Sequence, residues 1–285
     1  MSEKISIVLP VHNGSKYVRG SIDSCLAQTH KDFELIVVDD CSTDATPDIL
    51  SSYRDPRLRV IRNKVNQRLP RSLNIGFKAA TGDYLTWTSD DNEFIPGAIE
   101  KMLEALRREP AVDFVYADYW AMDETTGKKE AVRVPDKLSL DLKNEVGGCF
   151  LYSRKCYEAV GDYNPYYEIV EDYDYWIRIW KRFTIRRCEG PLYLYRYHAQ
   201  SLTTTRHHQQ DLFDTILKYR HGYVPASKLG WSAAYYFDNV RRSGKTSQEK
   251  EAQRTHTMKM VRGLSRLFYP WFSFLAFIYS FRIKK

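Results

Sequence analysis

Two pairs of adjacent carboxylates follow apolar runs in the first hundred residues. Asp39 and Asp40 come after the run 33–38, and a Ser-Thr-Asp turn follows one residue later. An acid at the end of a strand can accept hydrogen bonds from a ribose or a base, as in dinucleotide-binding folds. The turn residues can also cap the next helix, and one loop can serve both purposes. The first pair therefore indicates a nucleotide site, with helix capping as the alternative.

Asp90 and Asp91 form the second pair, after the apolar run 84–87. Adjacent carboxylates repel each other unless a cation or hydrogen-bond donors neutralise them. A hard divalent ion that bridges to phosphate oxygens suits such a pair. Paired acids are also common on protein surfaces, so their position at the end of a predicted strand carries the functional interpretation.

A third acidic cluster, residues 171–174, opens a predicted helix over 172–181. Acids in the first turn of a helix are favoured by the helix dipole and need no catalytic role. A carboxylate at this position could also take a proton from an attacking hydroxyl. Residue types alone leave both interpretations open.

The elements that must position these acids alternate along the chain. Predicted strands cover 5–11, 33–39, 59–62, 84–88 and 114–116, and predicted helices cover 15–28, 44–53, 70–80 and 96–108. Further on, we expect short strands near 184–188 and 192–197, and a helical, basic chain beyond about residue 206. Alternating strands and helices predict an α/β fold whose mostly parallel sheet is flanked by helices on both faces. Ligands of such sheets bind beyond the carboxyl ends of the strands, where the two acidic pairs stand.

The sequence argues against several classes of protein. The chain has no G-x-G-x-x-G after the first strand and no G-x-x-x-x-G-K-[ST], so ordinary dinucleotide and P-loop sites are not predicted. Its five cysteines show no C-x-x-C spacing, which argues against a disulfide framework and a zinc site and fits a reducing compartment. The first seven residues lack the apolar stretch of an export signal.

Charge is distributed unevenly. Residues 206–285 hold 15 Lys and Arg against 5 Asp and Glu, whereas the preceding residues are slightly acidic in sum. The aromatic run 267–281 lies in this basic region, but it is shorter than a membrane-spanning helix and Pro270 interrupts it. We expect an in-plane segment on an anionic membrane surface and no nucleic-acid binding. The alternative is a helix that packs on the protein or on a second copy in a homo-oligomer.

Four blocks of the sequence resemble the large family 2 of inverting glycosyltransferases. They are residues 6–14, residues 37–44, residues 74–76 with 81–84, and residues 171–178, in the order and spacing of that family. The resemblance runs from about residue 4 to residue 205. It implies a GT-A type, Rossmann-like catalytic domain over 1–205, followed by the basic helical region 206–285.

The resemblance also implies roles for individual residues on the donor side. Pro10, Val11 and Asn13 would line the nucleotide pocket. Asp40 would face the base and Arg71 would help to hold the nucleotide.

Asp90 would then bind the ribose or groups near the phosphates, and Asp91 and His198 would hold a divalent metal, Mn²⁺ or Mg²⁺. One departure concerns this metal: the family's D-x-D-D form has an acid where this chain has Thr88.

On the acceptor side, Asp172 would be the general base. Gly147 and Gly148 match a glycine-containing acceptor loop, where a missing side chain lets a substrate approach the backbone, and Glu171 and Trp176 complete this side.

The implied reaction transfers a sugar, with inversion, from a nucleotide-diphosphate donor to an acceptor hydroxyl. UDP-linked donors are the first expectation, and the acceptor is expected to be a growing glycan or polyprenyl-linked saccharide of surface polysaccharide synthesis. The enzyme would lie in the cytoplasm, peripheral on the inner face of the cell membrane. The alternatives are a nucleotide-sugar-binding protein without catalysis and a sugar nucleotidyltransferase.

Overall fold

A nine-stranded sheet forms the centre of the computed structural model, which describes residues 3–225 and six isolated positions between 228 and 255. The strands are β1 (Ile5–Val11), β2 (Phe33–Asp39), β3 (Leu58–Arg62), β4 (Tyr84–Trp87), β5 (Glu93–Phe94), β6 (Val112–Asp123), β7 (Lys129–Val132), β8 (Phe150–Ser153) and β9 (Thr184–Tyr197). The helices are α1 (Val18–Leu26), α2 (Thr46–Ser51), α3 (Leu69–Ala79), α4 (Ala98–Arg108), α5 (Arg154–Val160), α6 (Glu171–Trp180), α7 (Leu202–Thr205) and α8 (His207–Arg220).

The sheet is parallel in its first half and mixed in its second. Its order is β3-β2-β1-β4-β8-β6-β9-β5, with β7 paired to β6. Strands β3, β2, β1 and β4 run parallel, whereas β8 runs antiparallel to both β4 and β6. The α/β fold class is confirmed, but the mostly parallel character holds for the first four strands. No helix lies between β7 and β8, and parallel neighbours usually need such a crossover connection, so β8 pairs antiparallel.

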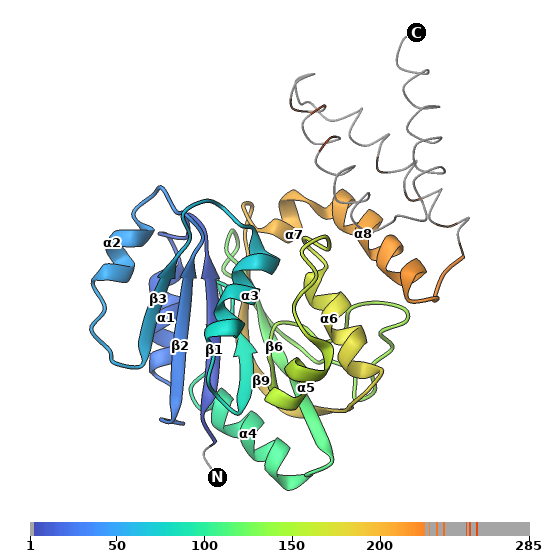
Figure 1. Cartoon of the computed structure of the whole chain (residues 1–285), viewed down its shortest axis with the longest axis horizontal. Helices are drawn as coiled ribbons and strands as arrows, with labels where there is room; N and C mark the ends of the chain where they lie inside the picture. The colour runs from blue at the N-terminus through green and yellow to red at the C-terminus, as the bar shows by residue number, and fades with distance from the viewer. Residues whose placement is uncertain are drawn as a thin grey trace. The chain divides into compact units, whose positions relative to one another are not determined.

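Helices cover both faces of the parallel half (Figure 1). Apolar side chains of β1 on one face, such as Ile5 and Ile7, share a core with α1 and α4. On the other face α3 packs so closely that a Cβ added at Gly76 would overlap Val8 Cγ1. Burial on both faces explains why β1 and β2 are continuous apolar runs, since each strand has a helix above and below it.

Strand β9 differs from its prediction. The sequence suggested two short strands at 184–188 and 192–197, but one strand runs from Thr184 to Tyr197. The intervening residues form an irregularity, with register shifts against β6 near Asp118 and with Gly190 at φ +93°. A β-bulge of this kind accommodates extra residues and bends the strand without ending it.

The chain divides into two compact units. The first comprises residues 1–163 and 172–201, and the second comprises 164–171 and 202–285. Within the second unit, Leu212 and Phe213 of α8 are buried, and Arg206 pairs with Glu168 at 3.1 Å. In the C-terminal part of the chain, the second unit begins at residue 202, four residues before the expected start of the basic region at 206. The roles expected for 1–205 and 206–285 remain predictions.

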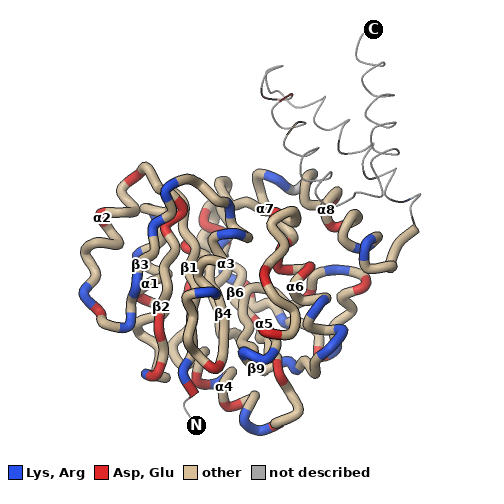
Figure 2. The backbone as a smooth tube through the Cα atoms, viewed as in Figure 1, with Lys and Arg blue, Asp and Glu red and all other residues tan. Residues whose placement is uncertain are grey.

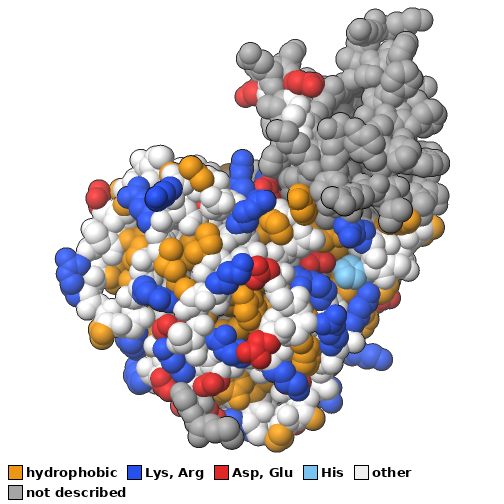
Figure 3. All heavy atoms as spheres, in the orientation of Figure 1, with side chains coloured by type: hydrophobic (Ala, Val, Ile, Leu, Met, Phe, Trp, Pro, Cys, Tyr) orange, Lys and Arg blue, Asp and Glu red, His pale blue; other side chains and the backbone are white. Residues whose placement is uncertain are grey.

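Two surface features bear on the membrane prediction. No helix in the described part of the chain is long and apolar enough to cross a membrane, and the aromatic run 267–281 lies outside the described residues. In the described body, basic and acidic residues are interspersed (Figure 2). The face in Figure 3 also carries basic, acidic and apolar side chains side by side. No single sign of charge dominates that face, so an anionic ligand would be attracted there by individual basic residues and not by a broad positive field.

Candidate active site

The loops that follow β1, β2 and β4 meet at one edge of the sheet. These strands are parallel, with Val11 beside Asp39 and Val8 beside Trp87. Parallel strands present their carboxyl ends at the same edge, so both acidic pairs lie on the same side of the molecule. The approach is close, because a Cβ added at Gly14 would overlap the Asp90 carboxylate.

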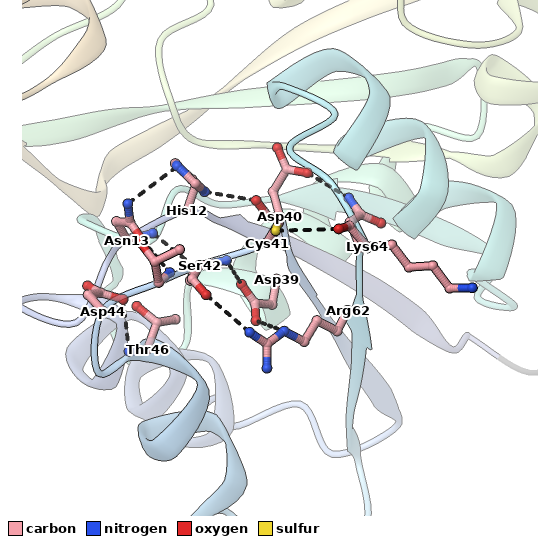
Figure 4. A network of polar contacts seen from close by, with 12 residues as sticks. His12, Asn13, Asp39, Asp40, Cys41, Ser42, Asp44, Thr46, Arg62 and Lys64 are labelled. Carbon is pink, nitrogen blue, oxygen red and sulfur yellow. Dashed lines mark hydrogen bonds and ion pairs between the residues drawn. The ribbon is translucent and has the colours of Figure 1, made fainter.

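Hydrogen bonds between Asn13 and the β2–α2 loop join that loop to the β1–α1 loop (Figure 4). The Asn13 backbone N–H donates to Ser42 Oγ at 3.0 Å, and Asn13 Oδ1 accepts from the Thr43 N–H at 2.8 Å. Asn13 has φ +55°, a left-handed conformation that asparagine tolerates better than most residues. Its carbonyl therefore holds the loop together, and its exposed amide nitrogen, which lies 3.4 Å from His12 Nε2, is the group that could face a ligand.

Asp44 strengthens the same junction. Its carboxylate accepts from the backbone N–H groups of Ser15 at 3.0 Å and Thr46 at 2.9 Å. Desolvation acts to raise the pKa of Asp44, but these hydrogen bonds outweigh it and the pKa is lowered overall. An ionised Asp44 therefore joins the starts of α1 and α2.

Asp39 and Asp40 have different tasks. Asp39 Oδ1 accepts from the Ser42 N–H at 2.9 Å, and Oδ2 pairs with Arg62 at 3.3 Å. Its side chain is 1% exposed, which makes Asp39 a structural residue of the β2–α2 loop.

Asp40 holds the loop that leads into α3. Its Oδ1 accepts from the Gln67 N–H at 2.7 Å and from Asn63 Nδ2 at 2.8 Å, and its Oδ2 accepts from the Arg68 N–H at 2.8 Å. Arg68 has φ +71° and ψ 163°, a conformation found almost only in glycine. Asp40 thus holds a strained turn in place, while Oδ2 keeps a lone pair that could accept from a base.

The other residues expected on the donor side differ in exposure. Pro10 and Val11 are buried in the sheet edge, so they could contribute shape and backbone but little side-chain surface. Arg71 is exposed in the first turn of α3 and makes no ion pair with a described residue. It can therefore reach an anionic ligand without first breaking an ion pair.

In the second acidic pair, Asp90 has a raised pKa, and Asp91 has a buried carboxylate oxygen without a hydrogen-bond partner among the described residues. Desolvation raises the pKa of Asp90 to about 8, and the charge of Asp91 adds to this effect. Asp91 Oδ2 lies 3.0 Å from His198 Nε2. Asp91 Oδ1 is buried and has no hydrogen-bond partner among the described residues. A buried carboxylate oxygen without a donor is costly unless a cation approaches it.

Side chains that sequence reasoning missed hold Asp91 and His198 together. The Arg196 backbone N–H donates to Asn92 Oδ1 at 2.8 Å, and Arg196 Nε donates to the Asp91 carbonyl at 3.1 Å. The Tyr17 ring lies 4.9 Å from the His198 ring. No local pattern in the sequence indicates these contacts, because Arg196 lies 104 residues from Asn92 and 105 residues from Asp91.

These residues fit a divalent metal, although no group of three or more His, Cys, Asp or Glu in the described chain could hold one alone. Asp91 and His198 supply two ligands, and Mg²⁺ commonly binds through one or two carboxylates together with substrate phosphates. Thr88 takes no part, since its buried hydroxyl bonds to Tyr193 Oη at 2.7 Å. An acid at position 88 would lose its hydration beside this ring.

Asp172 lies in the first turn of α6. Its Oδ1 accepts from the Tyr173 N–H at 2.7 Å, and its Oδ2 accepts from Asn144 Nδ2 at 2.9 Å. Desolvation raises the pKa of Asp172, and these two hydrogen bonds offset part of that rise. A carboxylate with a raised pKa is a stronger base than an exposed one, which suits proton abstraction.

A short loop connects Asp172 to the acidic pair. Asn144 contacts Asp172, and four residues later a Cβ added at Gly148 would lie 2.9 Å from the Tyr193 ring. The Tyr193 hydroxyl in turn bonds to Thr88. Four residues span at most roughly 15 Å, so the loop keeps Asp172 on the same side as β4's carboxyl end.

The residues expected on the acceptor side are largely packed. Added Cβ atoms at Gly147 and Gly148 would meet the rings of Tyr119, at 3.1 Å, and Tyr193, so tyrosine rings occupy the space that the missing side chains leave. Trp176 is fully buried, and its ring centroid lies 4.4 Å from that of Phe150. Its position corrects the expectation that Trp176 faces an acceptor, because the side chain belongs to the core.

Glu171, the first residue of α6, is also buried, at 3% exposure. Its acceptor role stays a prediction, as do the roles of Gly147 and Gly148.

Solved structures with the same fold include TarS of S. aureus. Residues 1–349 of TarS in complex with UDP superpose with a TM-score of 0.60 at 16% identity, over 95% of this chain and 75% of that one. The complex of the same TarS fragment with UDP-GlcNAc gives 0.59 at 17% identity, over 92% and 74%. At these identities the likeness establishes the fold.

Several sequence relatives are named as glycosyltransferases. An uncharacterized glycosyltransferase of Rickettsia prowazekii is 31% identical over 232 residues, which are 76% of this chain and 72% of that protein. A Bacillus subtilis protein provisionally named teichuronic acid biosynthesis glycosyltransferase TuaG is 33% identical over 150 residues, 51% of this chain and 59% of its own length. The profile of glycosyl transferase family 2 matches residues 6–161. Since that match covers more than half of the chain, the protein belongs to glycosyl transferase family 2.

Proposed function

We propose that this glycosyltransferase moves a sugar from a UDP-linked donor to an acceptor hydroxyl, with inversion at the sugar C1. The observation that carries the proposal is the meeting of Asp40, Asp90 and Asp91 at one sheet edge, with Asp172 tied to that edge by the 144–148 loop. The complexes of TarS with UDP and UDP-GlcNAc support a uridine nucleotide.

On the donor side, Asp40 Oδ2 accepts from the base, and Arg71 contacts the nucleotide phosphates. Asn13, at the end of β1, lines the pocket from the other loop. Asp91 and His198 would hold a divalent ion, which when bound neutralises charge on the diphosphate leaving group.

On the acceptor side, Asp172 removes the proton of the attacking hydroxyl. That oxygen forms a bond to C1 as the bond from C1 to the diphosphate breaks, and the nucleoside diphosphate leaves. Attack from the face opposite the leaving group inverts C1, so an α-linked donor yields a β-glycoside. General-base assistance of this kind contributes about 10²–10⁴ in rate.

The direct test is nucleotide release over a panel of nucleotide sugars, with and without a chelator. We expect one UDP-sugar to support release, loss of release with chelator, and recovery with Mn²⁺ or Mg²⁺. NMR of the product anomer reports the stereochemistry. Turnover only of a nucleoside triphosphate with a sugar 1-phosphate would identify a nucleotidyltransferase, and donor binding without any turnover would indicate a binding protein.

The acceptor and the membrane form a separate part of the proposal. The name of the TuaG relative supports a role in surface polysaccharide synthesis, and the basic flanks of the aromatic run 267–281 favour an anionic membrane surface on the cytoplasmic side. A polyprenyl-linked saccharide would suit such a location.

Liposome flotation of the full chain and of a chain ending near Arg262, at low and high salt, tests the membrane location. We expect only the full chain to float with anionic lipid. If neither form floats and the shortened chain changes its oligomeric state, the tail is a packing element.

A further inference from the structure

Glu124, the first residue after β6, is connected to His198 in two ways. Its backbone N–H donates to the carbonyl of Tyr197, the residue before His198, at 3.0 Å. Its carboxylate Oε2 accepts from the Tyr17 hydroxyl at 2.6 Å, and the Tyr17 ring lies 4.9 Å from the His198 ring. One residue therefore holds both the backbone next to His198 and the ring that packs against its imidazole.

Two cations add to the contacts that fix Tyr17. Lys16 Nζ lies 4.7 Å and Arg196 Cζ lies 5.4 Å from the centroid of the Tyr17 ring. Cations at such distances from an aromatic face are attracted to it. Lys16 also pairs with Glu124 Oε1 at 2.8 Å, and Arg196 pairs with Glu93 at 2.8 Å. The Tyr17 ring is thus held through its hydroxyl and through contacts with its face.

The His198 ring depends on such support. Its side chain is 8% exposed, and the structure gives the ring a single hydrogen bond within the described residues, between Nε2 and Asp91 Oδ2 at 3.0 Å. One hydrogen bond lets an imidazole turn about the axis of that contact, whereas a ring packed beside it restricts the turn. Histidines that bind metals are normally oriented by neighbouring groups, and loss of such a group typically costs 10–100-fold in metal affinity or activity.

We propose that Tyr17 and Glu124 position His198 for the divalent ion, and that the turn after β6 is thereby coupled to binding of the donor. The inference rests on the proposed role of Asp91 and His198 as metal ligands. Tyr17 and Glu124 are positioning residues, because they act on the ion through His198.

The first test is the Mn²⁺ concentration that gives half of the maximal gain in UDP affinity, measured by calorimetry on the full chain. Tyr17→Ala removes the ring and should raise this concentration about 10–100-fold. Tyr17→Phe and Glu124→Ala keep the ring but remove its hydrogen bond, and each should raise the concentration about 2–10-fold. UDP affinity without Mn²⁺ should stay unchanged in all three variants.

Tyr53→Phe is the matched control. Tyr53 is also half-buried, and its hydroxyl donates to Asp23 Oδ1 on α1 at 2.6 Å, so the variant loses a phenol–carboxylate hydrogen bond of the same length. It should leave the Mn²⁺ requirement unchanged. Equal losses in Tyr53→Phe and Tyr17→Phe would reflect weakened packing of α1 and would overturn the proposal.

A double variant tests whether Tyr17 and Glu124 act together. Tyr17→Phe combined with Glu124→Ala should lose no more Mn²⁺ affinity than the weaker single variant, because both changes remove the same hydrogen bond. Losses that multiply would show independent effects and would contradict the coupling. A loss of UDP affinity without Mn²⁺ in Tyr17→Ala would indicate direct contact with the nucleotide and would also overturn the proposal.

Crystal structures of the metal-free full chain separate this inference from the metal assignment. We expect the contact between His198 Nε2 and Asp91 Oδ2 in the wild type and its loss in Tyr17→Ala; a retained contact would overturn positioning. If His198→Ala abolishes the Mn²⁺ effect and Tyr17→Ala keeps it, positioning fails while the metal site stands. Absence of any Mn²⁺ effect in the wild type would refute the proposed metal and, with it, the role of this positioning in donor binding.

Discussion

Asn144 offers a direct test of the base, because it is the only side chain for which the structure gives a hydrogen bond to the Asp172 carboxylate within the described residues. Asn144 Nδ2 donates to Asp172 Oδ2 at 2.9 Å. The donor stabilises the ionised carboxylate, so its removal must raise the pKa of Asp172 further. A general base works when it is ionised, and activity is lost as the pH falls through its pKa. The acid limb of the pH profile should therefore move to higher pH in Asn144→Ala.

The size of the shift follows from the exposure of Asn144. A hydrogen bond to a charged group contributes about 1.5–3 kcal/mol when water is excluded. Asn144 is exposed, so water replaces part of the lost bond and roughly 0.5–1.5 kcal/mol remains. Since 1.36 kcal/mol corresponds to one pKa unit, the limb should move by roughly 0.4–1 pH unit. Asn144→Asp should move it further, because a second carboxylate then faces the first.

The assay is nucleotide release, with kcat/KM measured across the acid limb, which reports the free enzyme. Leu142→Ala is the matched control, since Leu142 is 66% exposed in the same loop. It should leave the limb in place. A fall in rate at all pH values with an unmoved limb in both Asn144 variants would refute the reasoning, because Asn144 would then affect folding or binding and not the ionisation of Asp172.

Three further predictions concern the base, the metal and the packing. Asp172→Asn should lower turnover at least a hundredfold and keep nucleotide binding, and residual activity above about a tenth would exclude Asp172 as the base. Asp91→Ala should abolish the Mn²⁺ dependence of UDP binding seen by calorimetry, whereas Asp40→Ala should weaken binding and keep that dependence; equal loss in both would contradict the assignment. Gly76→Ala should cost about 1–3 kcal/mol in urea unfolding, because its Cβ would overlap a methyl group of β1. Gly20→Ala in α1 is the comparison and should cost less, because its added Cβ would approach only Glu93 Oε1, at 3.1 Å, and alanine favours the helix.

Much of the parallel half of the sheet was predictable from the sequence. The strands at 5–11 and 33–39 were predicted with the bounds that the structure has. These strands are buried on both faces, so their apolar runs are long and end at polar loops. The positions of Asp40 and Asp91 at strand ends followed from the same pattern.

Predictions failed where pairing partners lie far apart in the chain. Strand β8 (Phe150–Ser153) was missed, because nothing in its four residues indicates that β4 and β6 lie on either side of it. Trp176 was assigned to the acceptor side by resemblance, although α6 turns it into the core. The direction of a side chain depends on what packs against its helix.

The sequence by itself determined the alternation of strands and helices, the first four strands and the acidic residues that follow β2 and β4. These properties are local, because the length and composition of a run reflect its own burial. Only the tertiary structure decided that Asp40 supports a strained turn, that Asp91 meets His198, and that Asn144 contacts Asp172. Each of these contacts joins segments 28 to 107 residues apart, and such contacts form only when the packed sheet brings the segments together.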